Sequence, residues 1–305
     1  MIFFLMIPAA LLLTILIPHN AFAWGPGIHL QLGSAVLSNL QLLEPAVAAV
    51  ISEFPHDFLY GCIAADITFG KKFTHYLLNC HRWRVGLKVL EKAAIPSHRA
   101  CAYGYISHLA ADTIAHNYFV PYKIMLSFST LTLKHAYWEM RFESFADKEI
   151  WETGRKISQE NYQKNDLLLR RVLAETIFSF GTNKRIFNSI LLVSRLDKWQ
   201  QMLKTYRDSS RYILEDTDRD EYMALALEAV FEVLNGMEES RYFQADPTGE
   251  RALLSAEAVR KNLRFLYRSG KINKAQAMEQ LAELKGNLRE AICEPEQLAQ
   301  IFAVE

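Results

Sequence analysis

The sequence has few cysteines, no excess charge of either sign and little strand-like alternation. Lys and Arg number 34, as do Asp and Glu, so the formal net charge is zero. This balance argues against broad electrostatic binding to nucleic acid, because that mode needs a basic face. Half of the 305 residues are hydrophobic and 22% are charged. This composition is that of an ordinary globular protein and excludes a disordered or collagen-like chain.

Several catalytic signatures are also missing. The sequence contains neither a P-loop nor a serine nucleophile elbow, which excludes nucleotide-driven work and covalent serine chemistry of those types. It has no CxxC motif, so a thiolate zinc site is not expected. The four cysteines are Cys62, Cys80, Cys101 and Cys293. Their even number allows one disulfide in an oxidising compartment, and four buried thiols are the equal alternative.

No Lys or Arg precedes Lys71, and the first segment of the chain is apolar. Residues 2–18 form an apolar run followed by the small-x-small signature of Ala21 and Ala23. This pattern predicts a signal peptide over residues 1–23, cleavage between Ala23 and Trp24, and a secreted or periplasmic protein. The missing basic residues depart from the usual signal. The alternative is an uncleaved anchor, for which the run is of marginal length and contains two prolines.

The remaining sequence is typical of helices. Apolar residues recur at three- and four-residue spacing, and the expected helical ranges are 31–51 with a break at Pro45, 56–69, 83–94, 101–118 closed by Pro121, 132–147, 165–180 and 221–237. We therefore predict an all-α domain with additional C-terminal helices. The expected units are a signal peptide over 1–23, a metal-binding catalytic core over 24–150, helices completing the domain over 151–244, and a helical C-terminal extension over 245–305. The acids Asp216, Asp218 and Asp220 are expected to open a helix at its positive end.

Two rows of histidine and carboxylate carry the chemical signal. His108, Asp112 and His116 lie at i, i+4 and i+8 in an apolar helix, so their side chains share one face. His135 and Glu139 repeat the i, i+4 spacing in a second helix. Burying these groups without partners would cost roughly several kcal/mol of folding free energy, and metal coordination removes that cost. Imidazole with carboxylate favours zinc over calcium or magnesium.

Further metal-ligand types lie upstream of these rows. Asp66 is a carboxylate in an apolar run, and His75 and His81 follow it. His29 lies five residues after Trp24 and would be a weak candidate by itself.

In this order the residues resemble the bacterial zinc-dependent phospholipase C family, whose superfamily includes fungal single-strand-specific zinc nucleases. The resemblance covers roughly residues 24–148 and includes the unusual Trp24 at the predicted mature terminus. It implies an all-helical phospholipase C/nuclease-like fold with up to three zinc ions. Carried over by position, one zinc would be held by Asp66, His81, His108 and Asp112, a second by His116, His135 and Glu139, and a third by the amine and carbonyl of Trp24, His29 and a bridging Asp112.

Two points in this assignment depend on spacing. His116 lies eight residues after His108, whereas the family pattern usually has ten, but the shorter spacing keeps His116 on the same helix face. Asp66 to His81 is near the family spacing, so we favour His81 over His75 as the ligand. The resemblance also suggests Asp66 as the base that assists the attacking water.

The sequence leaves three functions open. The first is a secreted, zinc-dependent phospholipase C-type hydrolase that acts on phospholipid or another phosphodiester, with peripheral membrane contact. Five apolar and aromatic side chains could line its acyl or glycerol cleft or could instead belong to the core: Tyr118, Phe119, Tyr122, Met125 and Phe128. The second is a single-strand nuclease or nucleotidase, which the cations Lys71, Lys72, Arg82 and Arg84 keep open. The third is a non-catalytic, metal-stabilised helical module that binds lipid or a partner. Nucleic acid is not the first choice of partner.

Overall fold

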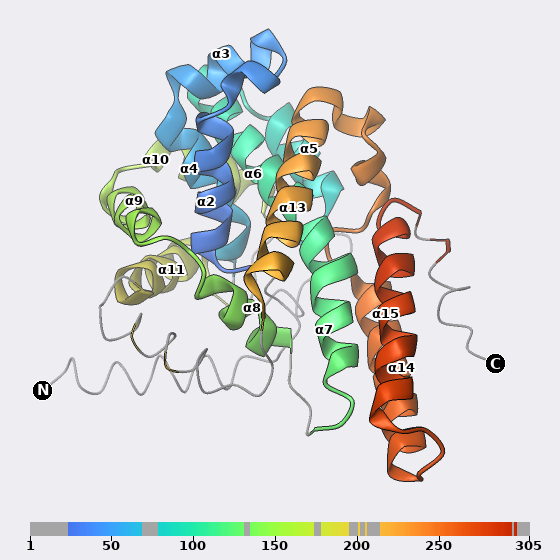
Figure 1. The fold of residues 1–305 in the computed structure, drawn as a ribbon. Coiled ribbons are helices and arrows are strands. Elements are labelled where there is room, and N and C mark those ends of the chain that lie inside the picture. The colour runs from blue at the N-terminus through green and yellow to red at the C-terminus, as the bar shows by residue number, and fades with distance from the viewer. Residues whose placement is uncertain are drawn as a thin grey trace, which may run out of the picture.

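The structure, a computed structural model, is a helical assembly around one long buried helix (Figure 1). It describes residues 24–68, 79–130, 135–173, 178–194, 201, 205, 214–294 and 296–297. The secondary structure of these residues contains helices and no strand, which confirms the all-α prediction. Within the described ranges no helix is long and apolar enough to cross a membrane. The predicted signal peptide, like Lys71, Lys72 and His75, lies outside them.

Proline sets the start of several helices. The helices α2 (Pro26–Leu37), α3 (Pro45–Glu53), α4 (Pro55–Ala64) and α6 (Pro96–Ile114) all begin at a proline. At the first helical position the missing N–H sacrifices no intrahelical hydrogen bond, and the fixed φ suits the helix. The break predicted at Pro45 is therefore present, and the expected run over 31–51 is divided between α2 and α3.

The long helix α6 continues through a wider turn into a further helix. A π-helical turn over Ala115–Phe119 joins α6 to α7 (Val120–Leu126). The prediction that Pro121 closes this helix was wrong. Its ring would clash with the carbonyl four residues earlier in a regular α-helix, and the wider turn before it accommodates the ring. The same turn carries His116, so it also sets where that side chain points.

Two glycines bring α4 and α6 unusually close. A Cβ on Gly61 would lie 2.1 Å from the carbonyl oxygen of Cys101, and a Cβ on Gly104 would lie 2.0 Å from that of Phe58. Neither distance is sterically allowed, so only glycine permits this contact. Asp66, in the 3-10 turn at the end of α4, lies near the second half of α6, with its Oδ1 4.0 Å from His108 Nε2.

The other helices surround this pair. They are α5 (Trp83–Glu91), α8 (His135–Glu143), α9 (Lys148–Gln159), α10 (Gln163–Val172), α11 (Phe180–Ser194) and α13 (Asp216–Gly236). The helix α13 packs on α6 and begins with Asp216 and Asp218 in its first turn, as predicted. All four cysteines have free thiols.

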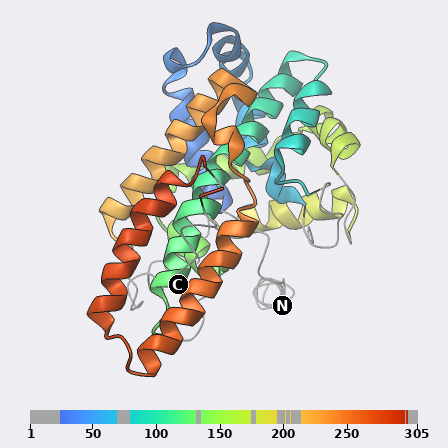
Figure 2. The same ribbon diagram turned by 90° about the vertical axis from the view of Figure 1, so that its right-hand side faces the viewer.

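The chain ends in a helical hairpin of α14 (Glu250–Arg268) and α15 (Lys274–Glu290). Both helices pack against α7, and the end of the hairpin projects beyond the rest of the molecule in both views (Figures 1 and 2). Its base is held by charge: the Nζ atom of Lys285 on α15 lies 3.2 Å from Asp218 Oδ1 and 2.8 Å from Glu221 Oε2 on α13.

Candidate metal centre

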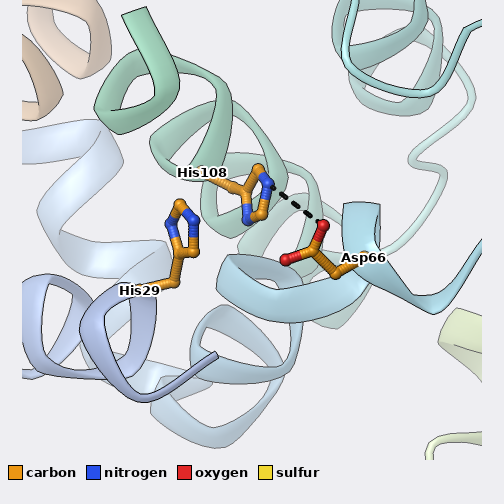
Figure 3. Close-up of side chains that lie close together, drawn as sticks. All are labelled: His29, Asp66 and His108. Carbon is orange, nitrogen blue, oxygen red and sulfur yellow. Dashed lines mark ion pairs between the residues drawn. The ribbon is translucent and has the colours of Figure 1, made fainter. Parts of the chain in front are cut away.

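Five buried ligand-type side chains meet from four separate segments. His29 comes from α2, Asp66 from the 3-10 turn after α4, His81 from the residues before α5, and His108 and Asp112 from α6. We call these five residues the inner cluster, and each is at most 3% exposed. Figure 3 shows His29, Asp66 and His108 converging from their three helical segments.

The inner cluster's ring nitrogens and carboxylate oxygens face one another at short range. His81 Nε2 lies 3.2 Å from Asp66 Oδ1, 3.1 Å from His108 Nε2 and 3.4 Å from Asp112 Oδ2. His108 Nε2 lies 3.2 Å from the same Asp112 oxygen. The other oxygen of Asp112, Oδ1, lies 3.3 Å from His29 Nε2. Asp112 thus presents its two oxygens to two different sets of histidines.

Two observations indicate that these residues could hold a zinc ion. With Zn–N bonds of about 2.0–2.1 Å, neighbouring ligand atoms of a tetrahedral site are about 3.3 Å apart, close to most separations among Asp66, His81, His108 and Asp112; the separation of His108 Nε2 from Asp66 Oδ1 is longer, at 4.0 Å. In addition, both ring nitrogens of His29 and both oxygens of Asp112 are buried without a hydrogen bond of acceptable geometry. A bound cation would compensate these atoms.

Backbone carbonyls orient two of the histidines. The Nδ1 atom of His108 lies 2.8 Å from the carbonyl oxygen of Cys62, and that of His116 lies 2.6 Å from the carbonyl oxygen of Pro247. Because a carbonyl only accepts, each Nδ1 carries the proton and each Nε2 presents a lone pair to the centre. This is the tautomer that a metal-ligating histidine requires.

A second group lies at the π turn. His116, His135 and Glu139, here called the outer cluster, offer ligand atoms within 4.8 Å of one another. His135 Nε2 lies 2.7 Å from Glu139 Oε1, and His116 Nε2 lies 4.0 Å from the same oxygen. The Nε2 atom of His135 forms no hydrogen bond of acceptable geometry. The structure thus separates His116 from His108 and Asp112 of its own row and brings it to His135 and Glu139.

The two clusters differ in their electrostatics. Burial would raise the pKa of Asp112, but His108 and His29 outweigh it and hold that pKa well below its usual range. Burial would likewise lower the pKa of His108, but the carboxylates of Asp112 and Asp66 raise it. In the outer cluster burial prevails and lowers the pKa of His135 to about 4. A neutral His135 is ready to bind a metal without losing a proton.

One buried carboxylate was missed by the sequence reasoning. Glu143 accepts hydrogen bonds from the backbone N–H groups of Gly27 at 2.7 Å and Ile28 at 3.2 Å. It thereby satisfies the free donors at the start of α2, the helix that carries His29. Its sequence signal was available: Glu143 continues the row of His135 and Glu139 at the same four-residue spacing.

A glycine of the C-terminal segment also supports the outer cluster. Gly249 has φ +55°, and a Cβ there would lie 2.3 Å from the carbonyl oxygen of His116. The start of α14 therefore lies directly on the π turn, next to Pro247. This long-range contact has no sequence signal beyond a Pro-Thr-Gly turn.

Trp24 is fixed by its side chain. The indole is fully buried and stacks on Phe142 of α8 with ring centroids 4.9 Å apart. Glu143, the neighbour of Phe142, holds the backbone of Gly27 and Ile28. The residue predicted to begin the mature chain is therefore attached to the same helix, α8, that carries two ligands of the outer cluster.

The remaining candidates have structural surroundings. The five aromatic and aliphatic side chains considered for a cleft are buried and belong to the core: Tyr118, Phe119, Tyr122, Met125 and Phe128. Arg82 is paired with Asp246 and Glu250, each at 3.5 Å, and Arg84 is exposed on α5.

The described fold is helical and surrounds buried groups of histidine and carboxylate. These features place the protein in the class of helical proteins with a candidate multinuclear metal centre. The family profile described as "Zinc dependent phospholipase C" matches residues 28–177, just under half of the chain. The match includes every predicted ligand except Trp24. No curated protein and no solved structure matched the chain.

Proposed function

We propose that the protein is a secreted phospholipase C-like hydrolase that releases phosphorylated head groups from phospholipids. The observation that carries the proposal is the arrangement of Asp112, whose two oxygens face separate sets of histidines in a fully buried centre. Such an arrangement supports more than one cation in one site, and a phosphodiester is a substrate for which clustered cations are suited.

The zinc ions would be held as the resemblance implies. The inner cluster would supply ligands for one ion and, with Trp24, for a third, and the outer cluster would supply the second. When bound, zinc supplies Lewis-acid stabilisation of phosphoryl oxygens and lowers the pKa of a coordinated water.

Asp66 is the residue we assign to proton transfer. Its carboxylate is buried, and Oδ1 lies 3.2 Å from His81 Nε2. Asp66 can therefore both bind a cation and accept a proton from an attacking water. The roles of the other inner-cluster residues are to hold charge and to fix the positions of the reacting groups.

The nuclease alternative gains no support from the described residues. Of the four cations that kept it open, Arg82 is engaged with Asp246 and Glu250, which connects the residues before α5 to the start of α14. Arg84 is exposed on α5, and the neighbouring Trp83 is engaged within the fold, where it stacks on Phe243 and donates a hydrogen bond to the carbonyl oxygen of Ala245. We therefore retain phospholipid as the substrate class.

A substrate panel tests the proposal. The mature protein, loaded with zinc, is assayed on phosphatidylcholine, on phosphatidylglycerol, on a soluble phosphodiester and on single-stranded oligonucleotides. We expect released phosphorylated head group, and we expect its loss in Asp66→Asn but not in Asp220→Asn, an exposed carboxylate on α13. Cleavage of oligonucleotides alone would contradict the phospholipid assignment, and no hydrolysis of any phosphodiester would contradict the enzymatic one.

We also propose that secretion and metal binding are linked through Trp24. Cleavage after Ala23 would free the α-amine of Trp24, whose indole is already fixed in the core. An amine binds zinc only when neutral, so binding should lower its pKa from the usual value of about 7.7–8.0. A form extended by one methionine has an amide at this position and should lose one zinc ion and most activity. Equal zinc content and activity in both forms would contradict the link.

A further inference from the structure

The free end of the C-terminal hairpin combines positive charge with exposed aromatic side chains. We define the hairpin tip as residues 261–274, the last turns of α14, the connection and the first residue of α15. It contains five cations and no acid. Four of these cations are exposed: Lys261, Arg268, Lys271 and Lys274. The tip also lies beyond residue 177, where the family match ends.

The apolar part of the tip is the exposed aromatic ring of Phe265. Phe265 is 63% exposed, and Lys271 Nζ lies 5.9 Å from its ring centroid. Leu254, 64% exposed, lies eleven residues earlier and hence on the same face of α14. The opposite face of α14 supplies its packing through Ala256 and Leu263. The helix α14 therefore presents two exposed apolar side chains on its outward face, with the exposed Lys261 between them.

The stability of the hairpin does not account for this charge. Lys274 is the first residue of α15, where a positive charge opposes the helix dipole. The start of α15 is already stabilised by a capping box between Asn273 and Gln276. The hairpin is anchored at its other end, through Lys285. The exposed cations thus have no described role in holding the two helices together.

From these observations we propose that the hairpin tip docks on the surface of an anionic phospholipid bilayer. Lysines and arginines near the surface are attracted to acidic head groups, while an exposed aromatic ring and aliphatic side chains enter the interface. The inference rests on the proposed function, because it supplies the contact through which a lipid hydrolase reaches its substrate. Gly249, directly before α14, lies against His116, and α14 has 19 residues, so the far end of α14 lies about 28 Å from the outer cluster along the helix.

Vesicle sedimentation with the full mature chain tests the proposal. The probes are phosphatidylcholine vesicles with and without phosphatidylglycerol. We expect binding only to the mixed vesicles, weakening with salt. The double variant Lys271→Gln/Lys274→Gln should bind about tenfold less tightly or worse, and Phe265→Ala should lose several-fold. The matched control is Lys88→Gln/Lys92→Gln, which removes two exposed cations from the end of α5 and should bind as the parent does.

The outcomes separate this inference from the proposed function. Equal affinity for both vesicles, no binding, or an equal loss in the control would overturn the docking site. Tip-dependent binding to a single-stranded oligonucleotide instead of vesicles would overturn it in favour of a nucleic-acid partner. Tip-dependent vesicle binding without hydrolysis of any phosphodiester would support the docking site and contradict the hydrolase. Hydrolysis of the soluble phosphodiester should be unchanged in the tip variants.

Discussion

The inner and outer clusters are built in different ways from similar residues. The inner cluster collects side chains from four segments, and Asp112 and His108 shift each other's pKa in opposite directions. The outer cluster takes its side chains from α8 and the π turn alone, and burial lowers the pKa of His135 to about 4. The difference indicates that the inner cluster is coupled through one shared carboxylate, while the outer one depends on how two helices are positioned.

Removing the shared carboxylate should have the largest effect. Asp112→Asn keeps the size of the side chain but removes the charge that faces both His29 and His108. We expect phosphodiesterase activity to fall by roughly a thousandfold or more, because each lost factor of ten corresponds to about 1.4 kcal/mol and metal charge stabilisation provides several. Inner-cluster zinc should be lost with helicity mostly retained, as measured by metal analysis and circular dichroism. Activity near that of the parent would show that Asp112 has no bridging role.

A ligand of the outer cluster should have a smaller and more local effect. His135→Ala removes a side chain whose Nε2 lies 2.7 Å from Glu139 Oε1 within the outer cluster. We expect the loss of one zinc ion, retention of the inner cluster's zinc and a fall in activity of roughly a hundredfold. If all zinc is lost together, the two clusters are not separable.

The support of the outer cluster can be tested with a pair of glycines. Gly249→Ala and Gly270→Ala both place a Cβ at positive φ, but only the first meets an obstacle, the carbonyl of His116. The left-handed conformation should cost each variant about 1 kcal/mol of the free energy of unfolding. The clash should lower the free energy of unfolding of Gly249→Ala by a further ~1–3 kcal/mol. Denaturant unfolding and zinc titration should show weakened outer-cluster binding in this variant only. Equal behaviour of the pair would contradict the support from α14.

The smallest effect is expected at Glu143, and it depends on pH. Burial raises the pKa of Glu143 to about 7, although the N–H groups of Gly27 and Ile28 lower it. The folded chain therefore holds this proton more tightly than the unfolded chain does, so folding stability in metal-free protein falls as pH rises from about 4.5 to about 7. Glu143→Gln lacks this titration and should gain about 1–3 kcal/mol relative to the parent between pH 5 and pH 8. Urea unfolding in chelator measures the difference, and parallel pH profiles would contradict the assignment.

Local pattern was sufficient for much of this fold and part of the site. Four-residue spacing pointed to the pairs His108 with Asp112 and His135 with Glu139, because neighbours on a helix face are fixed by helix geometry; it placed His116 on the face of His108, from which the π turn separates it. It could not show that Pro121 lies inside a continuous helix, since a π turn depends on what packs around it. The contacts of Pro247 and Gly249 with His116 join residues more than 130 apart and had no local signal. Glu143 had a local signal, because it occupies the third position of the four-residue row that begins with His135 and Glu139.

The most direct test of the account is the number of zinc ions bound to the parent chain and to His135→Ala, counted by native mass spectrometry. The account predicts more than one zinc in the parent and one fewer in the variant, because the two clusters bind separately. At most one zinc in the parent, or a variant with the same count as the parent, would contradict it.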